Sequence, residues 1–89
     1  MINRQLTIKG KVQGVSFRIE TMKMAGLLKV TGYVKNLPDG SVYVEVEGDE
    51  ANVFNLIDYC HHGPELAEVE HLSVRENALV GYKSFEIRY

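Results

Sequence analysis

The sequence predicts an α+β domain in which two helices cover one face of an antiparallel β-sheet. Two observations favour this class. Apolar and polar residues alternate along several short segments, and two longer segments instead repeat at helical spacing. The order of these segments is strand, helix, strand, strand, helix, strand, with a further short strand at the C-terminus. With 89 residues the chain is expected to form a single domain, residues 1–89, around one modest core.

The first half of the chain gives the clearest patterns. Residues 2–9 alternate and indicate a half-buried strand. Residues 17–28 predict an amphipathic helix, because apolar and small side chains recur every three or four positions. Residues 30–36 read as a second strand with Tyr33 on one face and Val34 on the other.

A hairpin follows the second strand. Residues 37–40 have the sequence Leu-Pro-Asp-Gly, in which proline presets the first central turn position and glycine takes the left-handed one. Residues 41–47 then alternate, with three valines on one face. Glu45 and Glu47 occupy the opposite face, and we expect them to be solvated.

The second helix is expected to begin at Asp49, a suitable N-cap, and to end at Gly63-Pro64. Residues 67–75 form a further strand whose alternation changes parity, which suggests a bulge near His71. Residues 77–81 are expected to be a loop and residues 82–89 the last strand. This order is the split βαβ pattern of the ferredoxin-like (βαββαβ) fold, with a short extra C-terminal strand.

The connection between the first strand and the first helix is a candidate anion site. Gly10 and Gly14 allow a tight turn, and such a turn can direct successive backbone N–H groups into one hollow. The first N–H groups of a helix starting at Phe17 lack intrahelical partners and add to that hollow. Arg18 supplies a planar charged group that can bind two oxygens of a phosphate or carboxylate. The run lacks the Gly-Lys-Ser/Thr of a P-loop and the third glycine of a dinucleotide fingerprint.

The lengths of the predicted helix and strand place Asn36 near the same loop. The helix 17–28 runs about 18 Å away from the loop. The strand 30–36 returns by about 23 Å, so Asn36 should end near Arg18. An asparagine before a turn is often structural, but next to an anion site its amide can orient a water molecule, because it carries a donor and an acceptor.

The sequence gives little support for a cysteine nucleophile, a metal site or an RNA-binding surface. Cys60 lies on the expected inward face of the second helix and is predicted to be an inert core thiol. His61, His62 and His71 lack metal-ligand spacing, so no metal site and no cofactor are predicted. An RNA-binding sheet would need several exposed aromatics, whereas the central strand has only Tyr43.

Charge and composition limit the partners. Residues 1–35 hold seven basic and one acidic side chain, +6, whereas residues 36–89 hold three basic and eleven acidic ones, −8. The two halves either neutralise each other or leave a positive field around the first loop that attracts a small anion. No apolar run approaches a membrane span, and neither a signal-peptide pattern nor a second cysteine is present. We therefore expect a cytoplasmic protein, acting as a monomer on a small molecule, without nucleic-acid or membrane partners.

Two runs resemble the signatures of the acylphosphatase family. The first is Gly10-Lys11-Val12-Gln13-Gly14-Val15-Ser16-Phe17-Arg18, in which Ser16 stands where many members have glycine. The second is Gly32-Tyr33-Val34-Lys35-Asn36-Leu37-Pro38-Asp39-Gly40-Ser41-Val42. The Gly63-Pro64 step with Ala67 and Val69 also matches, so the similarity covers almost the whole chain.

The resemblance implies metal-independent hydrolysis of acyl phosphates to a carboxylate and inorganic phosphate. It implies catalytic roles for Arg18, which binds the phosphoryl group, and Asn36, which positions the attacking water. The phosphate-binding loop would comprise Val12, Gln13, Gly14, Val15, Ser16, Phe17 and Arg18. Two alternatives remain open: a non-catalytic phosphate- or carboxylate-binding module on the same fold, and a small regulatory or assembly domain that uses its sheet edge.

Overall fold

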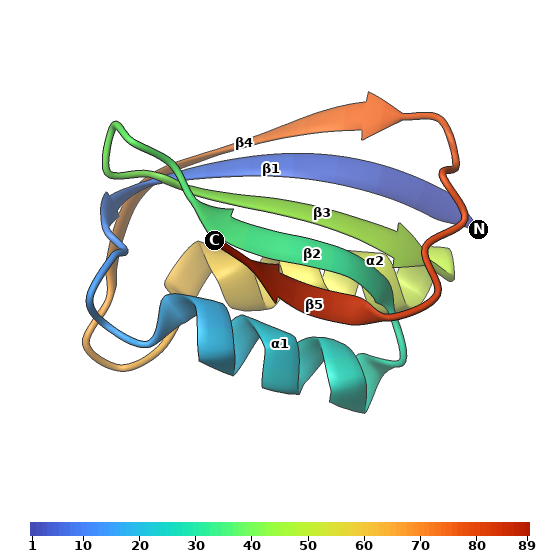
Figure 1. Ribbon diagram of the computed structural model, residues 1–89, viewed down its shortest axis with the longest axis horizontal. Coiled ribbons are helices and arrows are strands. Elements are labelled where there is room, and N and C mark those ends of the chain that lie inside the picture. Colours follow the sequence, from blue (N-terminus) through green and yellow to red (C-terminus); the bar gives the residue numbers. More distant parts are fainter.

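The computed structural model describes residues 1–89 and has the expected α+β architecture, with one five-stranded sheet and two helices on the same face of it (Figure 1). The elements in chain order are β1 (Ile2–Lys11), α1 (Phe17–Leu28), β2 (Thr31–Asn36), β3 (Val42–Gly48), α2 (Glu50–His62), β4 (Glu68–Asn77) and β5 (Phe85–Arg88). The strand order across the sheet is β4-β1-β3-β2-β5. The ferredoxin-like fold class is therefore confirmed.

The sheet is mixed rather than wholly antiparallel. β1 pairs antiparallel with β3 and β4, and β2 pairs antiparallel with β3. The short C-terminal strand β5 lies parallel to the outer side of β2, with Val34 opposite Ile87. Sequence alternation predicts a strand but does not reveal which neighbour it pairs with, so the parallel edge was not predictable.

The core fills the space between the sheet and the helices. The valines of β3 at positions 42, 44 and 46 are fully buried, and so are Leu6 and Ile8 of the neighbouring β1. Phe17 contributes the largest fully buried side chain from the first residue of α1. Burial of this side chain fixes where α1 begins, and the helix has the predicted bounds.

The bulge predicted near His71 is present. Lys9 pairs with His71 and Gly10 with Val69, so Glu70 is the extra residue on β4. Gly10 has a φ of +129°, and a Cβ atom added there would lie 2.2 Å from the carbonyl oxygen of Glu68. The first glycine of the loop is therefore required by the close approach of β4 rather than by the anion site.

Glu45 and Glu47 are buried, at 4 % exposure each, and the expectation that they are solvated was wrong. The carboxylate of Glu47 accepts hydrogen bonds from the backbone N–H groups of Val80 (2.7 Å), Gly81 (2.8 Å) and Tyr82 (3.3 Å). Glu45 accepts bonds from the hydroxyls of Tyr82 (2.6 Å) and Tyr43 (3.0 Å). The chain between β4 and β5 thus covers the sheet face opposite the helices, and β5 begins at Phe85 instead of the predicted residue 82.

Replacing Glu47 by glutamine should destabilise the protein and reduce its sensitivity to acid. Burial opposes ionisation, but hydrogen bonds from the loop backbone and Asn3 outweigh it and hold the pKa of Glu47 below its ordinary value of 4.5. A lowered folded pKa stabilises the protein above about pH 5, and that contribution is lost as the pH falls through the folded pKa. At pH 7 we expect Tm to fall by about 4–8 °C, the effect of about 1 kcal/mol in a domain of this size.

Thermal melts between pH 3 and pH 7 measure this effect. The matched control is Glu68→Gln, which removes an exposed carboxylate from β4. A Glu47→Gln variant that matched the control at every pH would show that the loop contacts contribute nothing to stability.

Candidate active site

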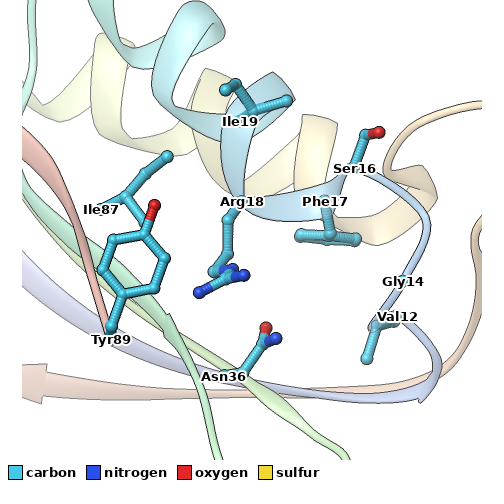
Figure 2. A pocket seen from close by; sticks show the side chains of 9 residues that line it. All are labelled: Val12, Gly14, Ser16, Phe17, Arg18, Ile19, Asn36, Ile87 and Tyr89. Carbon is cyan, nitrogen blue, oxygen red and sulfur yellow. The ribbon is translucent and has the colours of Figure 1, made fainter.

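One pocket of about 170 Å³ lies at the end of the sheet where α1 begins, β2 ends and β5 ends (Figure 2). Its lining joins three segments that are distant in sequence. The residues are Val12, Gly14, Ser16, Phe17, Arg18, Ile19, Asn36, Ile87 and Tyr89. Arg18 and Asn36 therefore line the same pocket, as the element lengths predicted.

The loop before α1 has the backbone geometry of an anion-binding hollow. Gly14 has a φ of +73°, and Ser16 has a φ of +64° with a ψ of +22°. Alternation of left-handed residues with their neighbours turns successive N–H groups toward one side. None of the nine backbone hydrogen bonds outside the helices and strands uses an amide of residues 12–16 as its donor. These N–H groups remain available to a ligand, beside the positive end of α1.

Ser16 lies in the left-handed region of backbone conformation, which favours glycine. Serine in the left-handed region carries a steric cost that glycine avoids. Its side chain does not cap α1 with a hydrogen bond. Ser16 therefore adopts a left-handed conformation that glycine would adopt at lower cost.

Arg18 is the only charged side chain that lines the pocket. It forms no salt bridge within the chain, and its guanidinium carbon lies 4.8 Å from the centre of the Tyr89 ring. Figure 2 shows the guanidinium extending into the middle of the pocket. A half-buried cation with no carboxylate partner is poised to bind an external anion.

Asn36 reaches the pocket because of strand geometry. It is the last residue of β2 and shares the helix-covered face with Val34, two positions earlier. Its side-chain amide forms no hydrogen bond within the chain, and in Figure 2 it points toward the guanidinium of Arg18. The donor and the acceptor of this amide are both free.

Two residues of the predicted phosphate-binding loop do not line this pocket. Val15 is buried at 6 % exposure and anchors the loop in the core. The side-chain Nε2 of Gln13 instead donates to the carbonyl oxygens of Leu37 (2.8 Å) and Ser41 (2.9 Å). Gln13 therefore ties the loop to the turn that follows Asn36.

Replacing Gln13 by alanine should impair both stability and catalysis. The loss of two hydrogen bonds would free the loop from the 37–41 turn, and small errors in the placement of reacting groups lower rates strongly. We expect a fall in kcat/KM of about tenfold or more and a lower Tm. Gln13→Met is the matched control for side-chain bulk: it should behave like Gln13→Ala, and wild-type rates for Gln13→Met would show that the hydrogen bonds are not needed.

Three lining residues were not identified from the sequence: Ile19, Ile87 and Tyr89. Ile19 follows Arg18 directly and sits on the exposed side of the helix start. Ile87 and Tyr89 reach the pocket only because β5 lies beside β2. Their alternation with Phe85 was visible, but the position of the strand was not.

No side-chain carboxylate, histidine or cysteine lines the pocket. Cys60 is fully buried in α2, and burial raises the pKa of its thiol to about 12, as expected for an inert core cysteine. No three His, Cys, Asp or Glu side chains come together as a candidate metal site. Neither helix has the length and apolar character needed to cross a bilayer.

The chain is similar to known proteins over nearly its whole length. The family model described as Acylphosphatase matches residues 4–87. The acylphosphatase of Geobacter metallireducens is 46 % identical over 85 residues, which cover 94 % of this chain and 91 % of that protein. The acylphosphatase of Archaeoglobus fulgidus is 40 % identical over 89 residues and covers both chains completely.

A solved structure gives the same result for the fold. The crystal structure of acylphosphatase from Bacillus subtilis superposes with a TM-score of 0.97 at 33 % identity and covers both chains fully. The family model and these relatives span nearly all of the residues that form the sheet, the helices and the pocket. The chain belongs to the acylphosphatase family.

Proposed function

We propose that Arg18 and the backbone N–H groups of residues 12–18 bind the phosphoryl group of an acyl phosphate, and that Asn36 orients the attacking water. The enzyme hydrolyses the carboxyl–phosphate anhydride to a carboxylate and inorganic phosphate. One observation carries the assignment of roles: an unpaired guanidinium, an unpaired side-chain amide and unbonded loop N–H groups share one small pocket.

The groups in this pocket match the chemical requirements of acyl-phosphate hydrolysis. Water attacks phosphorus, the bond from phosphorus to the carboxylate oxygen breaks, and its electron pair leaves with the carboxylate. A carboxylate whose conjugate acid has a pKa of about 4 departs without a general acid. Phosphoryl transfer depends mainly on positioning and on stabilising charge on the phosphoryl oxygens, which fixed N–H groups and an arginine supply.

The proton of the attacking water needs an acceptor. The lining contains no side-chain carboxylate and no histidine to serve as a general base. We propose that an oxygen of the substrate's own phosphoryl group takes this proton. Asn36 would then act by accepting one hydrogen bond from the water, which aligns it for attack.

Release of phosphate from acetyl phosphate and benzoyl phosphate, in buffer that contains a chelator, tests this function. We expect turnover with both substrates and competitive inhibition by inorganic phosphate. Binding of phosphate without turnover would instead identify a non-catalytic anion-binding module. Loss of activity in the chelator alone would contradict metal-independent hydrolysis.

We also propose that residues 1–89 act as a single domain and as a cytoplasmic monomer without a cofactor or a nucleic-acid partner. The fifteen buried apolar residues form one cluster, and the sole cysteine is buried. On the sheet face opposite the helices, Tyr33 contacts both Tyr43 and Tyr82, and the guanidinium carbon of Arg88 lies 3.8 Å from the Tyr33 ring centre. Aromatic rings engaged in this way are poorly placed to stack with bases. An equilibrium mass measurement in solution tests whether the protein is a monomer.

A further inference from the structure

The segment that joins β4 to β5, residues 78–84, is fastened to the sheet by two buried carboxylates that the proposed reaction does not use. We call this segment the strap. The Glu47 carboxylate accepts hydrogen bonds of 2.7, 2.8 and 3.3 Å from three successive backbone N–H groups of the strap. The Tyr82 hydroxyl adds a bond of 2.6 Å to Glu45. The strap is therefore held through its backbone and through a side chain.

These two carboxylates are charged but have no cation beside them. Burial opposes their ionisation, but hydrogen bonds outweigh it and hold the pKa of both below the ordinary 4.5. Neither Glu45 nor Glu47 forms a salt bridge, and the Asn3 Nδ2 group donates to both, at 3.2 and 3.0 Å. A buried charge needs such donors, and bonds to a charged acceptor are stronger than neutral ones. The network therefore holds the strap rigidly.

The strap continues directly into β5, which runs from the strap to the pocket at the other end of the sheet (Figure 1). At the near end, the Gly32 N–H donates to the carbonyl oxygen of Ser84, the last residue of the strap (3.0 Å). β5 then pairs with β2 as far as Arg88 opposite Lys35, the residue before Asn36. The position of the strap therefore determines where this short strand lies along β2.

At the far end, β5 brings two side chains to the pocket. Ile87 lines it, and Tyr89 places its ring centre 4.8 Å from the guanidinium carbon of Arg18. Figure 2 shows the Tyr89 ring beside the guanidinium. Because Arg18 has no salt bridge within the chain, this ring contact constrains the direction of its guanidinium.

We propose that Glu47, with Glu45, is a positioning residue for the reaction. By fixing the strap, the two carboxylates hold β5 in place, and β5 holds the Tyr89 ring against Arg18. The guanidinium is thereby directed into the pocket before a phosphoryl group arrives. The inference rests on the proposed function, because it assigns the binding of the phosphoryl group to Arg18. It makes that binding depend on carboxylates that do not line the pocket.

The test measures the inhibition constant of inorganic phosphate, and kcat/KM for benzoyl phosphate, well below the melting temperature of each variant. Glu47→Gln keeps the size of the side chain and removes its charge. We expect the inhibition constant to rise about three- to tenfold and kcat/KM to fall by a similar factor, because a misplaced binding group lowers both. Tyr82→Phe removes only the hydroxyl bond to Glu45, so it should shift both quantities in the same direction by a smaller factor.

A double-mutant cycle with Tyr89→Ala tests the route from the strap to the pocket. If Glu47 acts through the Tyr89 ring, Glu47→Gln should raise the inhibition constant much less in the Tyr89→Ala protein than in the wild type. Equal factors in the two proteins would overturn the proposal, because Glu47 would then act independently of that ring.

Val53→Ala separates positioning from stability. Val53 is a fully buried residue of α2 outside the pocket lining, so its truncation should lower Tm by leaving a cavity and should leave the inhibition constant unchanged. The inference is overturned if Val53→Ala raises that constant as much as Glu47→Gln does at an equal loss of Tm, or if folded Glu47→Gln keeps the wild-type constant. A wild-type protein that neither hydrolyses benzoyl phosphate nor binds inorganic phosphate would contradict the proposed function itself, so the two failures are distinguishable.

Discussion

Replacing Arg18 by alanine is expected to lower kcat/KM for acyl phosphates by at least about 10³-fold, because charge on the transferring phosphoryl group would lose its only side-chain cation. The inhibition constant of inorganic phosphate should rise in parallel. The melting temperature should change little, since Arg18 has no ion pair in the chain. Steady-state kinetics with benzoyl phosphate, together with a thermal melt, measures both effects.

Arg18→Lys separates charge from geometry. A lysine ammonium is a point charge and cannot bind two phosphoryl oxygens as a planar fork, so the variant should remain severely impaired. Arg75→Ala, which removes an exposed arginine from β4, is the matched control and should retain wild-type kinetics. Inhibition of Arg18→Ala by phosphate at wild-type concentrations would contradict the assigned role.

Replacing Asn36 by alanine is expected to lower kcat by about 10²- to 10³-fold with little change in KM or in the inhibition constant of phosphate. The reason is that the water must be aligned only for the chemical step, whereas the phosphoryl group is bound by Arg18 and the loop. Stability should be nearly unchanged, because the Asn36 amide forms no hydrogen bond within the chain.

Two further variants sharpen this prediction. Asn36→Asp keeps the shape of the side chain but places a negative charge beside the phosphoryl group, so it should weaken the binding of phosphate as well as turnover. Asn55→Ala, an exposed asparagine of α2, is the matched control. A rise in KM at unchanged kcat in Asn36→Ala would identify Asn36 as a binding residue instead.

The central part of the site was predictable because it depends on local rules. The length of α1 and the return of β2 fix the distance between Arg18 and Asn36, and both lengths follow from periodicity. The loop amides follow from Gly14 and from the start of a helix at Phe17, whose burial is visible in the apolar pattern. Each of these steps uses residues that are near one another in sequence.

The outer part of the site depends on pairings that local patterns do not specify. β5 has only four residues and pairs with β2. The loop that leads into β5 is held by hydrogen bonds to Glu47, and the Glu47 carboxylate was expected to face solvent. The hydrogen bonds of Gln13 likewise reach across 24 and 28 positions. A buried polar group that binds a distant backbone gives no periodic signal, so these contacts could be seen only in three dimensions.

The placement of β5 has a practical consequence for anyone who attaches a peptide or a label to this protein. Any chain continued beyond Tyr89 would emerge at the mouth of the pocket, where it would compete with ligands for space. A chain joined ahead of Met1 would instead leave beside Gly48, at the opposite end of the sheet from Asn36. Purification tags and fusion partners are therefore better placed at the N-terminus. A C-terminal fusion offers a simple way to obstruct the pocket.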